Sequence, residues 1–174
     1  VLNGVKNLPG KSIIYFTQPS DKNFLYMKAV YMTEIGERST NASYFADSVV
    51  VEGFEKAGEY NVKLYSVSPG EAYSEPLEVK INPEEPPYIT AYKEMEIQPD
   101  FAGIRIKTSN TSNETLTFYV YRKDATGKWT EAGALYTKKQ EINEPIRGME
   151  AVPSEFSVVV KDRWGHLSES KEIS

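Results

Sequence analysis

Residues 59–64 read Glu-Tyr-Asn-Val-Lys-Leu, and residues 155–160, 96 positions later, read Glu-Phe-Ser-Val-Val-Val. Each run has an acidic residue, an aromatic residue and alternating apolar positions. A glycine turn follows each run, at Gly70 and at Gly165, and then a Ser-Glu pair begins a polar returning strand. Alternation with a period of two is typical of a half-buried β-strand. A hairpin that occurs twice at this spacing predicts two copies of one small all-β domain in tandem.

The alternation also predicts which residues form the two cores. Earlier strands align at an offset of about 91 residues. The expected core residues are Ile14, Phe16, Met27, Ala29, Tyr60, Val62 and Leu64 in the first copy, and Ile104, Ile106, Phe118, Val120, Phe156, Val158 and Val160 in the second. One-sided burial of this kind is what a two-sheet sandwich requires. The larger offset at the later hairpin indicates a small insertion in the second copy, around residues 138–153.

The clearest domain boundary is the segment Pro83-Glu84-Glu85-Pro86-Pro87. Three prolines in five residues cannot continue a sheet ladder and favour a stiff, extended connector. We therefore expect domains at 1–82 and 88–174, joined by a linker at 83–87, and the repeat disfavours one larger domain with a proline-rich loop. Helical periodicity is not convincing anywhere. The expected strands lie near 12–17, 24–32, 47–52, 59–67, 73–81, 88–97, 102–108, 115–123, 128–137, 155–162 and 167–173.

Composition narrows the class of partner. The 174 residues include 20 Lys and Arg, 25 Asp and Glu and no Cys, and the net charge is −5. Nucleic acids and anionic membranes select clustered positive charge, so neither is an expected partner. The sequence has no apolar run of the ~20 residues that a transmembrane helix needs. It begins with Val1 and carries no signal peptide, so we expect a processed or trimmed fragment.

Three motifs resemble those of fibronectin type III domains. Residues 54–60 resemble that family's Leu-x-Pro-Gly-x-x-Tyr segment, in which the tyrosine hydroxyl bonds to the backbone a few residues upstream. Residues 14–19 resemble its Leu-x-Trp-x-x-Pro strand, with Phe16 in place of the tryptophan. Residues 162–168 resemble its Asp-x-x-Gly-Asn-x-Ser hairpin. The resemblance implies two tandem immunoglobulin-like or fibronectin type III-like β-sandwiches, and Phe156, which has no hydroxyl, leaves the second corner without its hydrogen bond.

The order of motifs also resembles a pair of uncharacterised domains from Bacteroides-type surface lipoproteins. The segments that carry this resemblance are 26–31, 60–67, the Pro-Pro linker and 162–165. In such proteins a lipidation signal lies upstream and a discoidin-like (F5/8 type C) domain often follows. The resemblance implies an extracytoplasmic, cell-surface location as an outer-membrane lipoprotein, with the anchor outside this fragment, and a glycan-related role for the parent protein.

Catalytic chemistry has few candidate residues. The chain has a single histidine, His166, and no cysteine. This composition excludes a metal site built from several histidines and a cysteine nucleophile. As the base of a Ser-His-Asp triad His166 would need a nucleophile, but no Gly-x-Ser-x-Gly elbow is present, so we interpret it as a turn residue. Paired carboxylates among Glu94, Glu96 and Asp100 are better interpreted as solvated charge than as a glycosidase pair. We expect no enzyme, cofactor or metal, although a surface calcium near Asp162 or at Glu84-Glu85 stays open.

Exposed aromatic residues offer a second interpretation, because aromatic faces stack on the C–H patches of sugars. Trp129, Tyr136 and Trp164 lie in or near turns of the second domain, and Tyr73 lies just past a turn in the first. The favoured interpretation is structural: Trp129 packs across its hairpin and Trp164 covers the open end of the sandwich. If a glycan site exists, its expected residues are Trp164, Asp162, Arg163 and His166, with Trp129 as a further candidate.

These features predict a non-enzymatic extracellular module of a bacterial cell-surface protein. It would act as a spacer, an adhesion segment or a glycan-capture arm, because loops at the ends of sandwiches offer recognition surfaces. The alternatives are a direct carbohydrate-binding domain and an accessory domain of a glycoside hydrolase. A polysaccharide or another surface protein is the expected partner, and we expect a monomer.

Overall fold

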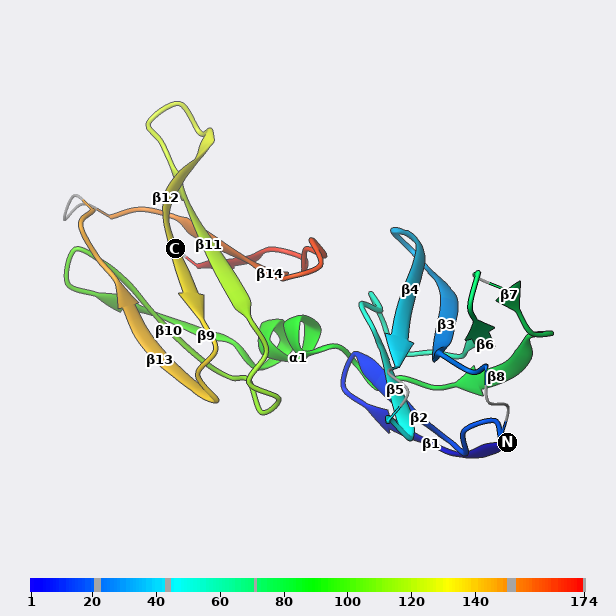
Figure 1. Cartoon of the computed structure of the whole chain (residues 1–174). Coiled ribbons are helices and arrows are strands. Elements are labelled where there is room, and N and C mark those ends of the chain that lie inside the picture. The colour runs from blue at the N-terminus through cyan, green and yellow to red at the C-terminus, as the bar shows by residue number, and fades with distance from the viewer. Residues whose placement is uncertain (21–22, 43–44, 71, 150–152, 174) are drawn as a thin grey trace. The chain divides into compact units, whose positions relative to one another are not determined.

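A computed structural model describes residues 1–20, 23–42, 45–70, 72–149 and 153–173 (Figure 1). The chain divides into two compact units, Val1–Pro86 and Pro87–Ser174. Each unit has its own hydrophobic core. The two are therefore described separately.

Unit 1 contains two antiparallel sheets. The first has the order β1-β2-β5, from β1 (Leu2–Leu8), β2 (Lys11–Phe16) and β5 (Ser48–Glu52). The second has the order β4-β3-β6-β7, and β8 also pairs with β6. Its strands are β3 (Tyr26–Thr33), β4 (Gly36–Ala42), β6 (Tyr60–Ser68), β7 (Ala72–Tyr73) and β8 (Leu77–Ile81).

Unit 2 repeats this connectivity after a short helix. Its first sheet has the order β13-β10-β9 and its second the order β12-β11-β14-β15. The elements are α1 (Pro87–Glu94), β9 (Glu96–Asp100), β10 (Gly103–Ser109), β11 (Leu116–Lys123), β12 (Trp129–Thr137), β13 (Glu141–Ile146), β14 (Phe156–Asp162) and β15 (Lys171–Ile173). In both units the second strand pairs with the first and the fifth, and the third strand pairs with the fourth and the sixth. This confirms the predicted fold class, two tandem β-sandwiches of immunoglobulin-like or fibronectin type III-like kind.

The predicted core faces are confirmed. Twelve of the fourteen expected core residues are less than 9% exposed, and the other two, Tyr60 and Phe156, are partly buried and pack against the cores. The predicted alignment of the two copies is shifted, however. Leu64 pairs with Ala29, and its counterpart Val160 pairs with Phe118, so Ala29 corresponds to Phe118 and not to Val120. A shift of two residues leaves every side chain on its expected face, which is why the core prediction survives it.

The corner of unit 1 forms as the fibronectin type III motif implies. The Tyr60 hydroxyl lies 3.1 Å from the carbonyl oxygen of Lys56, four residues upstream, and 2.6 Å from Glu34 Oε1. Its ring lies 4.4 Å from that of Phe54, which is 1% exposed. Burial and then the hydrogen bond to Glu34 raise the pKa of Tyr60 well above its usual range.

The strand predicted near 88–97 is wrong, because residues 87–94 form α1. Pro87 occupies the first helical position, where its fixed φ suits a helix and its missing N–H costs nothing. Tyr88, Ala91 and Met95 are buried at spacings of three and four, the helical pattern that the sequence reading did not detect in so short a segment. Lys171 Nζ donates to the carbonyl oxygens of Tyr92 and Met95, both at 2.9 Å, and so satisfies the end of the helix.

Several strands were not predicted, namely β1, β4, β9 and β13. All four lie at a sheet edge and are rich in polar residues or interrupted by proline, as at Pro99 and Pro145. Such strands lack the apolar alternation that marks central strands, because edges are kept polar against aggregation. The single strand predicted at 73–81 is two, β7 and β8, with Pro76 between them.

Candidate functional site

Four of the predicted site residues lie together in the turn after β14. Asp162 Oδ1 accepts hydrogen bonds from the backbone N–H groups of Trp164 and His166, both at 2.9 Å. Asp162 Oδ2 lies 2.8 Å from His166 Nδ1. Gly165 has a φ of 93°, which a residue with a side chain would adopt only with strain. Asp162 thus closes the turn through both carboxylate oxygens.

His166 faces the interior of unit 2. It is 4% exposed, and its ring stacks on Tyr88 of α1 with 5.7 Å between the ring centres. Its Nε2 is buried and has no hydrogen-bond partner among the described residues. An imidazole in this position holds α1 against the turn and does not offer a nitrogen to a surface ligand.

Trp164 and Arg163 lie on the outer side of the same turn. The Arg163 guanidinium carbon is 4.2 Å from the centre of the indole ring, so the exposed arginine covers one face of the half-buried tryptophan. The surface that this turn presents is therefore a cation stacked on a ring.

Trp129 does not belong to this cluster. On β12 it lies opposite Lys123, whose ammonium is 5.4 Å from the ring centre. Lys123 ends β11, whereas Leu116, opposite Asp162, begins it. Seven residue steps along the strand separate the two positions by about 23 Å at 3.3 Å per residue. The five predicted site residues therefore occupy two ends of one sheet.

Two of the three carboxylates considered as an acid–base pair, Asp100 and Glu94, have structural partners instead. Asp100 accepts a hydrogen bond from the N–H of Phe101 at 2.7 Å and pairs with Arg105 and Arg147 at 3.2 and 3.5 Å. The Phe101 N–H first, and then the two arginines, lower the pKa of Asp100. Glu94 accepts a hydrogen bond from Ser109. Within the described residues, no three His, Cys, Asp or Glu side chains gather as a metal site would require.

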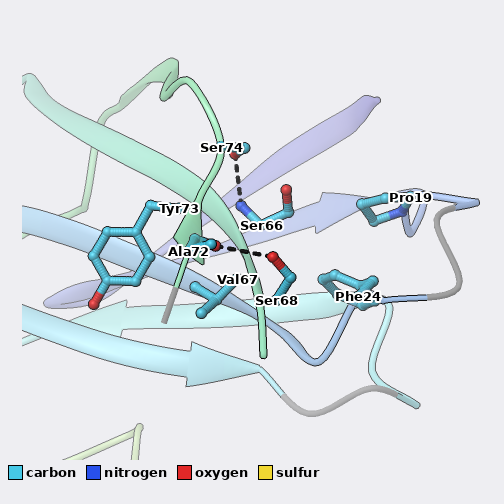
Figure 2. Close-up of a pocket in the computed structure, with 8 residues that line it drawn as sticks. All are labelled: Pro19, Phe24, Ser66, Val67, Ser68, Ala72, Tyr73 and Ser74. Atoms are coloured by element: carbon cyan, nitrogen blue, oxygen red, sulfur yellow. Dashed lines mark hydrogen bonds between the residues drawn. The ribbon is translucent and has the colours of Figure 1, made fainter. Parts of the chain in front are cut away.

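Unit 1 has an open hollow of about 230 Å³ at the edge where β6 meets β7 (Figure 2). Ser66, Ser68 and Ser74 line one part of it, with Phe24 and Pro19 beyond. Figure 2 shows the ring of Tyr73 extending away from the hollow. The Ser68 hydroxyl donates to Ala72 O at 3.2 Å, and Ser74 Oγ accepts from Ser66 N at 3.0 Å. These hydrogen bonds hold residues 72–74 to β6. We therefore interpret the hollow as a consequence of how this turn is held and not as a ligand site.

The sequence reading missed a cluster of tyrosines on the outer face of the same sheet. It singled out Tyr73 as an aromatic residue near a turn, but it did not connect Tyr73 with the strand residues beside it. Tyr26 and Tyr65 lie on that face as well, because Lys28 is directly opposite Tyr65 and Tyr26 is directly opposite Val67. Cross-strand register was the missing information, and the parity of each strand alone could not supply it.

Each half of the chain matches a known protein-family model. Residues 84–174 match the family described as Domain of unknown function (DUF5126), and the chain belongs to that family. Residues 1–83 match a second family, Domain of unknown function (DUF4959). None of the curated proteins gives a match.

The solved structures that resemble the chain include the following three. The SusE-like protein BT2857 is 34% identical over 51% of this chain, with a TM-score of 0.43, and the chain spans 30% of the length of that protein. A two-domain fibronectin type III segment of chicken tenascin is 14% identical, with 99% of this chain and 95% of that one covered and a TM-score of 0.43. The BSP domain of a biofilm-associated protein is 12% identical over 98% of this chain and 28% of its own, with a TM-score of 0.37. No described helix has the length and hydropathy of a membrane span.

Proposed function

We propose that this chain is a non-enzymatic extracellular module of a bacterial cell-surface protein, in which the two sandwiches act as a spacer. The observation that carries the proposal is the short connection between the units. Glu84 N–H donates to Leu8 O and Gly10 N–H donates to Glu84 O, both at 3.0 Å, so Glu84 is bound to unit 1. Pro87 already begins α1 of unit 2. Only Glu85 and Pro86 lie between, and so short a proline-containing connector suits a spacer.

A distance measurement tests the spacer. The chain has no cysteine, so spin labels can be placed at Ser39→Cys on β4 and Glu131→Cys on β12, both at exposed positions. Electron–electron resonance on this doubly labelled chain should give a narrow distance distribution. Inserting eight Gly and Ser residues between Glu85 and Pro86 should broaden it. A distribution in the unmodified connector as broad as that of the insertion variant would refute the spacer.

The proposed cell-surface location can be tested on cells that produce the protein containing this chain. We propose an outer-membrane lipoprotein whose anchor lies outside this fragment, and the resemblance to surface-lipoprotein domain pairs supports it. Antibodies raised against the chain should then label intact cells. Labelling that needs permeabilised cells would place the protein inside and overturn the proposal.

Direct carbohydrate binding is the second candidate function, and an accessory role to a glycoside hydrolase is a variant of it. Within unit 2 the proposed ligand-binding residues are Trp164, Asp162, Arg163 and His166, with Trp129 as a separate position. Their geometry favours Trp164 and Arg163, because Asp162 and His166 are engaged within the turn. Titration of tryptophan fluorescence with polysaccharides tests this site, and an unchanged spectrum across a broad panel would count against it.

A further inference from the structure

The exposed face of the sheet formed by β3, β6 and β7 carries three tyrosines. Val67 on β6 lies directly opposite both Tyr26 on β3 and Tyr73 on β7, and Lys28 lies opposite Tyr65. Directly opposite residues of antiparallel strands project to the same side of the sheet. These five residues project to one side of the sheet, which we call the tyrosine face.

Tyr73 presents a ring surface to solvent at this face. It is 49% exposed, and its ring centre is 5.6 Å from that of Tyr65, with the two planes tilted by 40°. Lys28 Nζ lies 3.2 Å from the Tyr73 hydroxyl oxygen but 5.2 Å from its ring centre. The ammonium is therefore beside the hydroxyl rather than over the ring. The result is an exposed aromatic ring with a hydroxyl and a cation at its edge.

Unit 2 shows that the sandwich does not need these tyrosines. At the 96-residue spacing of the repeat, Tyr65 and Val67 correspond to Lys161 and Arg163. Lys161 and Arg163 are a half-buried and an exposed cation, whereas Val67 is 1% exposed although it is not part of the core between the sheets. Lys161 pairs with Thr117 of β11, whereas Arg163 lies in the turn beyond β14. The strand pairing thus forms with a charged side chain in place of Tyr65. Unit 2 also has tyrosines on this face, Tyr119 and Tyr136, and Lys161 Nζ lies 5.9 Å from the Tyr119 ring centre. Because Lys161 stands where unit 1 has Tyr65, the pair of Tyr65 and Tyr73 is particular to unit 1.

We propose that the tyrosine face binds a neutral polysaccharide, with one pyranose ring stacked on Tyr73. This inference rests on the proposed extracellular role and gives it a ligand class. The face of an aromatic ring carries partial negative charge and attracts the polarised C–H groups on one side of a pyranose. The Tyr73 hydroxyl and the Lys28 ammonium lie at the ring edge, where they can bond to sugar hydroxyls. The net charge of −5 repels polyanions, so the expected polymer is uncharged.

Affinity electrophoresis of the whole chain tests the proposal. The gels contain amylopectin, galactomannan, xyloglucan, mixed-linkage β-glucan or yeast mannan, and polygalacturonate serves as the anionic comparison. At least one neutral polymer should retard the chain. Tyr73→Ala and Tyr73→Leu should weaken that binding about tenfold or more, as truncation of an aromatic anchor does. Tyr73→Phe, which keeps the ring, should stay within about threefold.

Matched control variants distinguish a loss of binding at Tyr73 from an effect of any exposed aromatic residue or of unfolding. Tyr136 on β12 is 68% exposed in unit 2, and Tyr136→Ala should bind like the unmodified chain. Tyr73→Leu keeps Val67 covered, so its melting temperature should stay close to that of the unmodified chain. No retardation by any neutral polymer, retardation by polygalacturonate alone, or equal binding by Tyr73→Leu would overturn the inference. Loss of binding in Trp164→Ala but not in Tyr73→Ala would also overturn it. Surface labelling and the distance measurement would still decide the module proposal in each case.

Discussion

The hydrogen bond between Tyr60 and Glu34 makes a specific contribution to unit 1 that one substitution can measure. Tyr60→Phe removes a hydroxyl whose single proton is shared between Glu34 Oε1 at 2.6 Å and Lys56 O at 3.1 Å. A hydrogen bond to a charged group contributes about 1.5–3 kcal/mol, and the exposure of Glu34 to water reduces this. We therefore expect a loss of about 1–2 kcal/mol in the free energy of unfolding of unit 1. For a unit of this size that lowers the melting temperature by about 5–10 °C.

The assay can separate the two units within one chain. Both tryptophans, Trp129 and Trp164, lie in unit 2, so tryptophan fluorescence in urea follows unit 2, whereas circular dichroism follows both units. Tyr60→Phe should move the dichroism transition of unit 1 to lower urea and leave the fluorescence midpoint unchanged. The ring contact with Phe54 remains, and unit 2 folds with Phe156 at its own corner, so the variant should still fold.

The same pair gives a pH dependence with a fixed sign. Burial raises the pKa of Glu34, but the bonds from Tyr60 and backbone N–H groups and the charge of Lys56 together outweigh it, so the pKa lies below its usual 4.5. A carboxyl group with a lowered folded-state pKa stabilises the fold above the unfolded pKa and loses that contribution as pH falls through the folded value. The stability difference between the unmodified chain and Tyr60→Phe should thus be largest near neutral pH and shrink below about pH 4. A difference that is absent at pH 7, or that grows in acid, would refute this account of the corner.

Three further substitutions test unit 2. Lys171→Met removes the ammonium that bonds the carbonyls of Tyr92 and Met95 at the end of α1, and should lower the free energy of unfolding of unit 2 by about 1–2 kcal/mol. Hydrogen exchange of the α1 amides should become faster, and unchanged exchange would contradict this role. His166→Asn keeps a turn-forming residue but loses the ring stacked on Tyr88, and should lower the urea midpoint of tryptophan fluorescence by an amount equal to about 1 kcal/mol, whereas an unshifted midpoint would show that the stack contributes nothing. Gly103→Ala would place a Cβ 1.8 Å from the carbonyl oxygen of Ile146, so we expect a loss of about 3 kcal/mol or more and poor soluble yield, and a stable variant would show that β10 and β13 can separate without cost.

Sequence pattern predicted the parts of this fold that depend on one strand at a time. Alternation placed Val62, Leu64, Val158 and Val160 on the buried faces because a central strand buries one side whatever its partners are. It could not fix the register between strands, and the alignment of Ala29 was two residues off for that reason.

Local chemistry likewise predicted the turn after β14 but not its surroundings. The four predicted site residues within 162–166 are close in sequence, so the turn motif alone brings them together. The Tyr88 ring that covers His166 comes from α1, a helix of eight residues stabilised by tertiary contacts more than by its own sequence. A short amphipathic segment after two prolines carries too few turns for its period to stand out.

Comparison of the two units separates what the sandwich requires from what unit 1 adds. Both units close the same sheets, yet unit 1 uses the Tyr60–Glu34 corner, and unit 2 uses α1 with His166 and Lys171. Stability can thus be supplied in different ways, and a feature of one unit is functional only if its loss changes binding more than folding. Tyr73 meets the structural condition for this, since about half of its surface faces solvent and its removal leaves the core between the sheets intact. If Tyr73→Ala instead destabilised unit 1 as much as Tyr60→Phe does, the tyrosine face would be a second stabilising device, and the argument for a ligand would fail.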